Sequence, residues 1–78
     1  MAYYAELDED NVVLRVNVVN DDYEPTEAEG IAWCESFWGG RWIKTSYNAA
    51  FNGFRGQYAG IGDVYDPVED KFYTPIEP

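Results

Sequence analysis

The stretch from Arg55 to Tyr73, RGQYAGIGDVYDPVEDKFY, holds three glycines, four aromatic rings and four carboxylates in nineteen residues. Three structures could use such a stretch: a glycine-rich phosphate loop, an acidic metal site, or a strand, a turn and a second strand. A phosphate-binding P-loop needs a lysine and a hydroxyl residue after its last glycine, at the start of a helix. Here Asp63 follows Gly62, and its carboxylate would repel phosphate. The glycine spacing does not fit a dinucleotide-binding turn either.

The metal alternative depends on carboxylates that could gather around a hard cation such as calcium. The candidates are Asp63, Asp66, Glu69 and Asp70. Their spacing is not that of an EF-hand loop, which places acidic residues at alternate positions and a glutamate at the twelfth. The chain has no histidine, so a Cys/His zinc site is impossible. We expect a solvated turn with no metal and no cofactor, while cation binding by this turn stays open.

The sequence also lacks the residues that nucleophilic catalysis needs. Cys34 is the only cysteine, and no histidine is present to activate it. It lies in an apolar stripe and is expected to be a small buried hydrophobe. Among the fifteen acidic residues, the sequence singles out no carboxylate pair for glycoside cleavage. We therefore predict a protein without catalytic residues, and not an enzyme.

The N-terminal segment AYYAELDEDNVVLRVNVVN is typical of a β-hairpin. Tyr3, Ala5 and Leu7 share one face of the first strand. In the second strand four apolar residues alternate with their neighbours, the period-two pattern of a half-buried strand; they are Val12, Leu14, Val16 and Val18. DEDN supplies turn-forming side chains between the strands.

A helix is predicted from Thr26 to Trp38. Thr26 and Glu29 have capping-box spacing, and the glycine pair after Trp38 suits a helix end. Ile31, Cys34 and Trp38 form one apolar stripe, with Trp33 and Phe37 beside it. Trp33 and Trp38 lie about 140° apart around the helix axis. We expect one of these tryptophans to cover the sheet and the other to sit at a rim or a subunit contact.

The remaining chain is predicted to be mainly extended. Arg41 to Tyr47 alternates like a strand, and NAAFNGFRG is expected to be a loop that pins Phe51 and Phe54 onto the body. A C-terminal hairpin follows, with strands at Tyr58 to Tyr65 and Lys71 to Tyr73, the turn DPVED, and TPIEP ending it. The predicted fold class is α+β, a small mainly antiparallel sheet with one helix, in a single domain of residues 1–78.

Charge and composition restrict the partners. The net charge is −10, which gives no electrostatic footprint for nucleic acid and opposes anionic lipid surfaces. The first residues lack a basic region and an apolar run, so no signal peptide is expected. The chain has three tryptophans, seven tyrosines and four phenylalanines, residues that fill cores and also the centres of interfaces. A domain this small without a staple is commonly stabilised by association.

Three motifs carry a family resemblance: MAYYAELDEDNVVLRV, GGRWIKTSYN and YAGIGDVYDPVEDKFYTP. They resemble a family of short proteins carried by marine phages, especially those of cyanobacteria. The resemblance implies a virion protein, made in the host cytoplasm, with no catalytic residues to carry over. Longer members continue in a tail similar to P-x-P-S-W, whereas this chain stops at Pro78.

The leading hypothesis is a capsid decoration protein that binds the major capsid lattice, with homo-oligomers possible. The alternatives are a tail, neck or fibre-associated adaptor of the virion, and an acidic mimic of DNA that inhibits a host protein. The residues expected at the protein–protein interface are Tyr58, Tyr65, Phe72, Tyr73, Trp33 and Trp38. An unpaired edge of the N-terminal hairpin, open to strand addition, is the second candidate surface.

Overall fold

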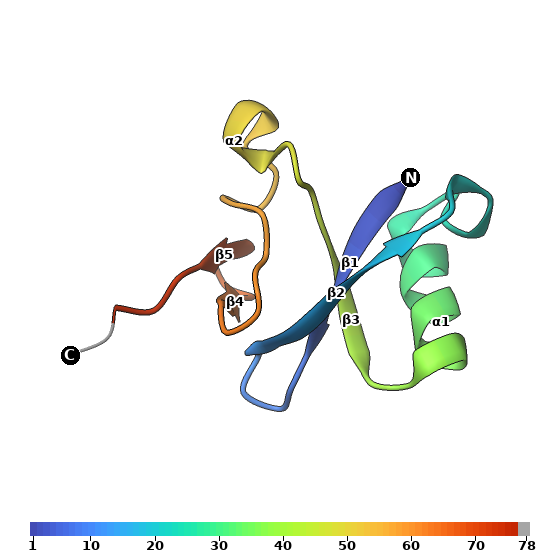
Figure 1. The fold of residues 1–78 in the computed structure, drawn as a ribbon, viewed down its shortest axis with the longest axis horizontal. Coiled ribbons are helices and arrows are strands. Elements are labelled where there is room, and N and C mark those ends of the chain that lie inside the picture. The colour runs from blue at the N-terminus through green and yellow to red at the C-terminus, as the bar shows by residue number, and fades with distance from the viewer. Residues whose placement is uncertain (77–78) are drawn as a thin grey trace.

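The computed structural model describes residues 1–76 and confirms the α+β class. A three-stranded antiparallel sheet has the order β2-β1-β3, and a separate two-stranded hairpin pairs β4 with β5. Figure 1 shows the helix α1 on one side of the sheet and the β4–β5 hairpin on the other. The central strand is therefore covered on both faces.

The sheet strands are β1 (Ala2–Leu7), β2 (Val13–Val19) and β3 (Arg41–Thr45). β1 pairs with β2 in a register that sets Tyr3 opposite Val18, and with β3 in one that sets Tyr3 opposite Thr45. Successive side chains of β1 point to opposite faces of the sheet, so neighbouring residues enter different apolar clusters. The predicted N-terminal hairpin is thus confirmed.

A β-bulge changes the predicted faces of β2. The register shifts between Glu6 and Leu7, so that Val13 lies opposite Leu7 and Arg15 opposite Glu6. The extra residue moves Val13 into the core and leaves Leu14 exposed. Val18 is also exposed, although the alternation placed it with the half-buried residues. A single inserted residue cannot be seen in a period-two pattern.

The helix α1 (Glu27–Trp38) begins and ends as predicted. The Thr26 hydroxyl caps it by accepting the Glu29 N–H at 3.2 Å, and Gly39 ends it with φ of 73°. A 3-10 turn, η1 (Asp21–Tyr23), connects β2 to the helix. Cys34 is fully buried against the sheet, as expected, and burial raises the pKa of its thiol to about 11.

The chain between β3 and the C-terminal hairpin differs from its prediction. A short helix, α2 (Ala49–Asn52), replaces the expected loop. Phe51 is 91% exposed, so the prediction that it is pinned to the body is wrong. Phe54 is half-buried, with the Arg55 guanidinium 4.9 Å from its ring centre. Helix formation turns Phe51 outward, while Ala49 takes the buried position.

The C-terminal hairpin is shorter than predicted. Its strands are β4 (Val64–Asp66) and β5 (Lys71–Tyr73), so the expected strand from Tyr58 to Tyr65 is wrong over most of its length. The cause is Asp63, whose carboxylate accepts the Gly60 N–H at 2.9 Å and folds the chain into a turn. The turn DPVED and the second strand are as predicted. The last two residues of TPIEP lie outside the described part of the chain.

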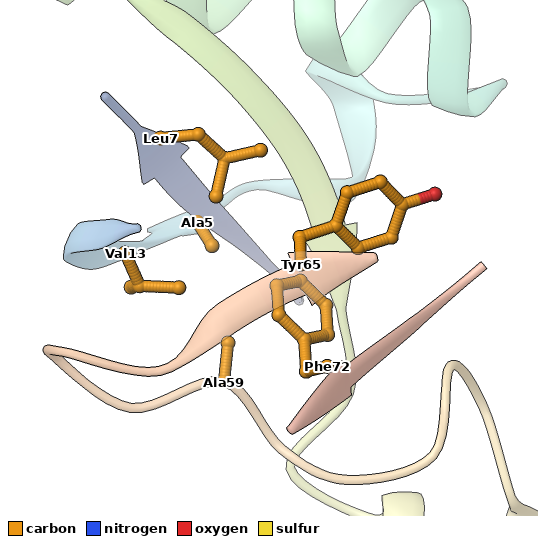
Figure 2. Packing of buried hydrophobic residues seen from close by; sticks show 6 residues of the cluster. All are labelled: Ala5, Leu7, Val13, Ala59, Tyr65 and Phe72. Carbon is orange, nitrogen blue, oxygen red and sulfur yellow. The ribbon is translucent and has the colours of Figure 1, made fainter. Parts of the chain in front are cut away.

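Two apolar clusters fill the space on either side of the sheet. The helix side contains Ala2, Tyr4, Val19, Cys34 and Trp42. The hairpin side contains Ala5, Leu7, Val13, Ala59, Tyr65 and Phe72, and Figure 2 shows these six side chains between the sheet and the hairpin. Dividing a small core into two layers lets short strands bury many rings in only 76 residues.

Candidate docking surface

Two of the residues predicted at the interface are core residues. Phe72 is 2% exposed and Tyr65 is 9% exposed, and their rings pack together with centres 5.2 Å apart (Figure 2). The prediction that they form a docking surface is wrong. Phe72 and Tyr73 are neighbours in β5 and face opposite ways, so they could not share the predicted surface, and the position of the sheet decides that the Phe72 face is covered.

The four carboxylates considered as metal ligands all have partners within the protein. Asp63 accepts from Gly60 and Thr74, and Asp66 accepts backbone N–H groups of the turn. Glu69 pairs with Lys71, and Asp70 pairs with Arg55. Within residues 1–76 no three His, Cys, Asp or Glu side chains are arranged to hold a metal ion. The acidic residues between Arg55 and Tyr73 shape turns and pair with basic side chains.

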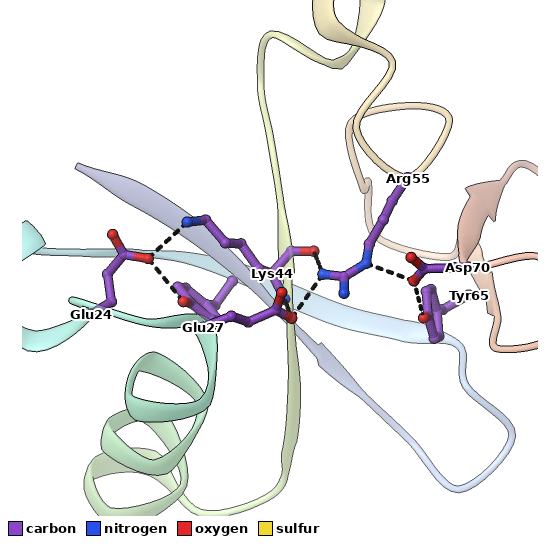
Figure 3. Close-up of polar contacts among 7 residues, drawn as sticks. Glu24, Glu27, Lys44, Arg55, Tyr65 and Asp70 are labelled. Carbon is purple, nitrogen blue, oxygen red and sulfur yellow. Dashed lines mark hydrogen bonds and ion pairs between the residues drawn. The ribbon is translucent and has the colours of Figure 1, made fainter.

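Arg55 connects the hairpin to the sheet and the helix. Its Nε donates to Asp70 Oδ1 at 2.7 Å, and its Nη1 donates to Glu27 Oε2 at 2.8 Å and to the Lys44 carbonyl at 2.9 Å. The Tyr65 hydroxyl donates to the same oxygen of Asp70, as Figure 3 shows. One guanidinium therefore joins all three layers.

These contacts shift pKa values in directions that fit the geometry. The bonds from Tyr65 and then from Arg55 lower the pKa of Asp70 below its ordinary value. Burial, helped by the bond to Asp70, raises the pKa of Tyr65 to about 12. Burial opposes the charge on Arg55, but the bonds to Glu27 and Asp70 outweigh it and raise its pKa. The cluster is a structural ion-pair network.

Tyr58 and Tyr73 are the exposed members of the predicted C-terminal surface. Tyr58 packs edge-on against Tyr3, with ring centres 5.8 Å apart, and Tyr3 contacts Tyr47 in the same way at 5.3 Å. This tyrosine group lies on the hairpin side of the sheet, beside Val18, because Val18 and Tyr3 are paired residues. Tyr3 and Tyr47 were not predicted here, since their contact with Tyr58 joins three distant segments.

The largest aromatic group runs along α1, and we call it the aromatic ladder: Tyr23, Trp33, Phe37 and Trp38. Trp33 is stacked between Tyr23 and Phe37, with ring centres 4.9 Å and 5.0 Å away. Trp38 packs edge-on against Trp33, with ring centres 5.2 Å apart, and also packs against Trp42 of the sheet. Phe37 is 66% exposed and Tyr23 is 50% exposed.

Trp33 and Trp38 are less separated than their helical positions predicted, because both are half-buried against the helix-side cluster and their rings meet. Trp38 covers Trp42, whereas Trp33 stands at the rim between two exposed rings. Neither is fully buried within this chain. The Arg15 guanidinium lies 5.8 Å from the Trp38 ring centre and places a cation at the β2 end of the ladder. Tyr23 was missed because only the 3-10 turn after β2 brings it back against the helix.

No protein-family model, curated protein or solved structure matches this chain. The phage-family resemblance of the three motifs therefore stays a prediction. No helix within residues 1–76 has both the length and the apolar character needed to cross a lipid bilayer. The candidate site is accordingly defined by geometry alone, as an exposed aromatic surface along α1 beside β2.

Proposed function

We propose that this chain is a non-enzymatic structural protein of a phage virion, most concretely a small decoration protein that binds the major capsid lattice. The motif resemblance supports the virion assignment. The single observation that supports docking is the aromatic ladder, in which stacked rings of Tyr23, Trp33 and Phe37 stand at the surface.

Rings in this arrangement suit the centre of an interface. Aromatic side chains are enriched there because they supply large apolar area at low conformational cost. Covering the exposed part of Phe37 alone would contribute roughly 2 kcal/mol of transfer free energy before the cost of association. The stack is already ordered by Trp33, so little side-chain freedom remains to be lost on binding.

The net charge of −10 fits the same role. A particle that carries hundreds of copies needs a surface that resists aggregation, and like-charged outer faces provide this. Docking through the aromatic ladder leaves the exposed acidic residues of the hairpin turn, Glu69 and Asp70, facing solvent. We assign the partner as another virion protein, with the capsid protein preferred.

The test has two parts, beginning with mass spectrometry of gradient-purified virions. We expect hundreds of copies per particle, whereas a dozen or fewer would move the protein to the tail or neck. Absence from purified particles would overturn the virion role and favour inhibition of a host protein by DNA mimicry.

The second part adds purified protein to particles that lack it. The variant Phe37→Ser should bind at least tenfold more weakly, because it removes the most exposed ring of the ladder. Phe51→Ser is the matched control, since Phe51 is equally large, is 91% exposed and lies in α2 away from the ladder. Equal binding by both variants would exclude the ladder as the docking surface.

A further inference from the structure

The two edges of the three-stranded sheet differ in whether their backbone groups are satisfied. At the β3 edge, the Lys44 N–H donates to Glu27 Oε2 at 3.3 Å, and the Lys44 carbonyl accepts from Arg55 Nη1 at 2.9 Å. Both groups therefore point away from β1. Two charged side chains occupy the place that an added strand would need beside Lys44, so this edge is blocked at that residue.

The orientation of the Lys44 N–H and C=O groups determines, for every other residue of the sheet, toward which neighbouring strand its own N–H and C=O groups point. In an antiparallel ladder, residues whose N–H and C=O point to one neighbour alternate with residues that point to the other. Because Lys44 points away from β1, Thr45 points toward it and bonds Tyr3, its partner in the register. The backbone N–H and C=O of Tyr3 thus bond to β3. Val18 is the partner of Tyr3 on β2, so the N–H and C=O of Val18 must point outward, away from β1.

The same alternation directs the backbone N–H and C=O groups of Val16 and Val13 away from β1, because these residues lie opposite Ala5 and Leu7. Val13 verifies it: its N–H donates to the Asp63 carbonyl at 2.8 Å, and its carbonyl accepts from the Gly62 N–H at 2.9 Å. For Val16 and Val18, no hydrogen-bond partner of these outward groups lies within residues 1–76. We call these two residues the free edge of β2.

Apart from the bulge and Arg15 at the start of β2, this strand lacks the features that commonly protect an exposed edge. From Val13 to Val19 there is no proline, lysine or acidic residue. Val18 is 47% exposed and, as the partner of Tyr3, lies on the side of the tyrosine group, and Leu14 in the bulge is 49% exposed. On the helix side, Arg15 lies between β2 and the aromatic ladder. A strand added here would meet apolar surface on one face and half-exposed rings on the other.

We propose that the free edge of β2 binds an extended segment of a partner protein by strand addition, and that this segment alternates apolar with basic residues. The apolar residues pack on Val16 and Val18, which share the hairpin face of β2. The basic residues lie on the other face, on the helix side of the sheet. Acidic clusters flank the strand, with Asp8 to Asp10 before it and Asp21 with Asp22 after it, and they favour positive charge on the partner.

A second copy of this chain fits the same edge less well. Two chains of net charge −10 repel each other. The segment at Gly62 and Asp63 also occupies the outward side of Val13, where the far end of an antiparallel β2 centred on Val16 would lie. A partner segment of about five residues avoids both problems. The inference goes beyond the virion role and holds for any partner that offers such a segment.

The first measurement is amide hydrogen exchange of the protein alone. The amides of Val16 and Val18 should exchange at least tenfold faster than those of Asn17 and Val19, which bond β1. Slow exchange at Val16 and Val18 in monomeric protein would show that these groups are already satisfied, and would overturn the inference.

The second measurement uses a synthetic seven-residue peptide of alternating lysine and valine, with blocked ends, in an NMR titration. We expect it to shift the amide signals of Val16 and Val18 and to slow their exchange. A fully N-methylated version keeps the charges and side chains but cannot pair with a strand. Absence of binding, or equal binding by both peptides, would overturn the inference.

A pair of variants tests the backbone directly. Val18→Pro removes the outward N–H and leaves the β1 bonds in place, so it should weaken peptide binding at least fivefold. Val18→Thr keeps the N–H and the branched side chain and should bind within twofold of the original, with β1 amide signals unchanged in both. Concentration-dependent dimers seen in sedimentation, and lost in Val18→Pro, would overturn the partner assignment in favour of a second copy.

Discussion

Glu24 is the carboxylate that ties the buried tyrosine of β1 to the edge strand β3. Its Oε1 accepts from the Tyr4 hydroxyl at 2.9 Å and from Lys44 Nζ at 2.9 Å, and its side chain is largely buried (Figure 3). A buried carboxylate is costly unless its oxygens are bonded. Burial and Glu24 together raise the pKa of Tyr4, so the phenol stays protonated and donates.

The variant Lys44→Met should therefore destabilise the protein by about 1 to 2 kcal/mol, because Glu24 loses its cation while Tyr4 still donates. Lys71→Met is the matched control: Lys71 pairs with Glu69 at the surface, and its loss should cost less than about 0.5 kcal/mol. Urea unfolding followed by tryptophan fluorescence measures both. Equal losses in the two variants would contradict a structural role for the Glu24 pair.

At the scale of the element, α1 approaches the sheet so closely that one helical position has no room for a side chain. Gly30 is buried, and a Cβ built there would lie 2.5 Å from Tyr4 Cζ and 2.8 Å from Glu24 Cβ. Tyr4 is fully buried and cannot swing aside. Close packing of the helix on β1 thus requires glycine at this position, in spite of its weak helix propensity.

Gly30→Ala should lower the free energy of unfolding by about 1 to 2 kcal/mol, since overpacking outweighs the propensity gain of roughly 1 kcal/mol. The cost should be smaller in a Tyr4→Phe background, because the hydroxyl is the nearest atom to the added methyl group. Thermal unfolding of the four proteins in a double-mutant cycle measures this coupling. A stabilising Gly30→Ala would refute the close approach.

At the scale of the whole molecule, the two apolar clusters each contain a group whose neutral form is stabilised by burial. Cys34 belongs to the helix-side cluster and Tyr65 to the hairpin-side cluster. Their pKa values are raised from 9.0 to about 11 and from 10.0 to about 12. A raised pKa in the folded state contributes stability that is complete below the ordinary pKa and is lost as the pH rises through the folded one.

Stability should accordingly be level up to about pH 9 and fall between pH 9 and pH 12, with Cys34 contributing up to about 3 kcal/mol of the loss. Urea unfolding at a series of pH values measures it. In Cys34→Ala the fall should begin about one unit later, near the ordinary pKa of Tyr65. An unchanged profile in that variant would show that the thiol does not titrate in this range.

Local rules predicted the elements whose signals lie within a few residues. Thr26 and Gly39 bound the helix because capping depends on neighbouring backbone groups, and alternation located β1 and β3. The helical spacing predicted Trp33 and Trp38 on different sides of α1, whereas their rings meet edge-on at 5.2 Å. The single cysteine and the absence of histidine also excluded an intrachain disulfide and a Cys/His zinc site from composition alone.

Only the tertiary structure decided which aromatic residues are buried in the core and which remain at the surface. Tyr65 and Phe72 became core because the hairpin folds onto the sheet, and the ladder formed because Tyr23 returns against Trp33. The blocking of the β3 edge at Lys44 likewise depends on Glu27 and Arg55, which are 28 residues apart in the chain. Such contacts join distant segments, and short-range patterns of hydrophobicity and turn residues carry no information about them.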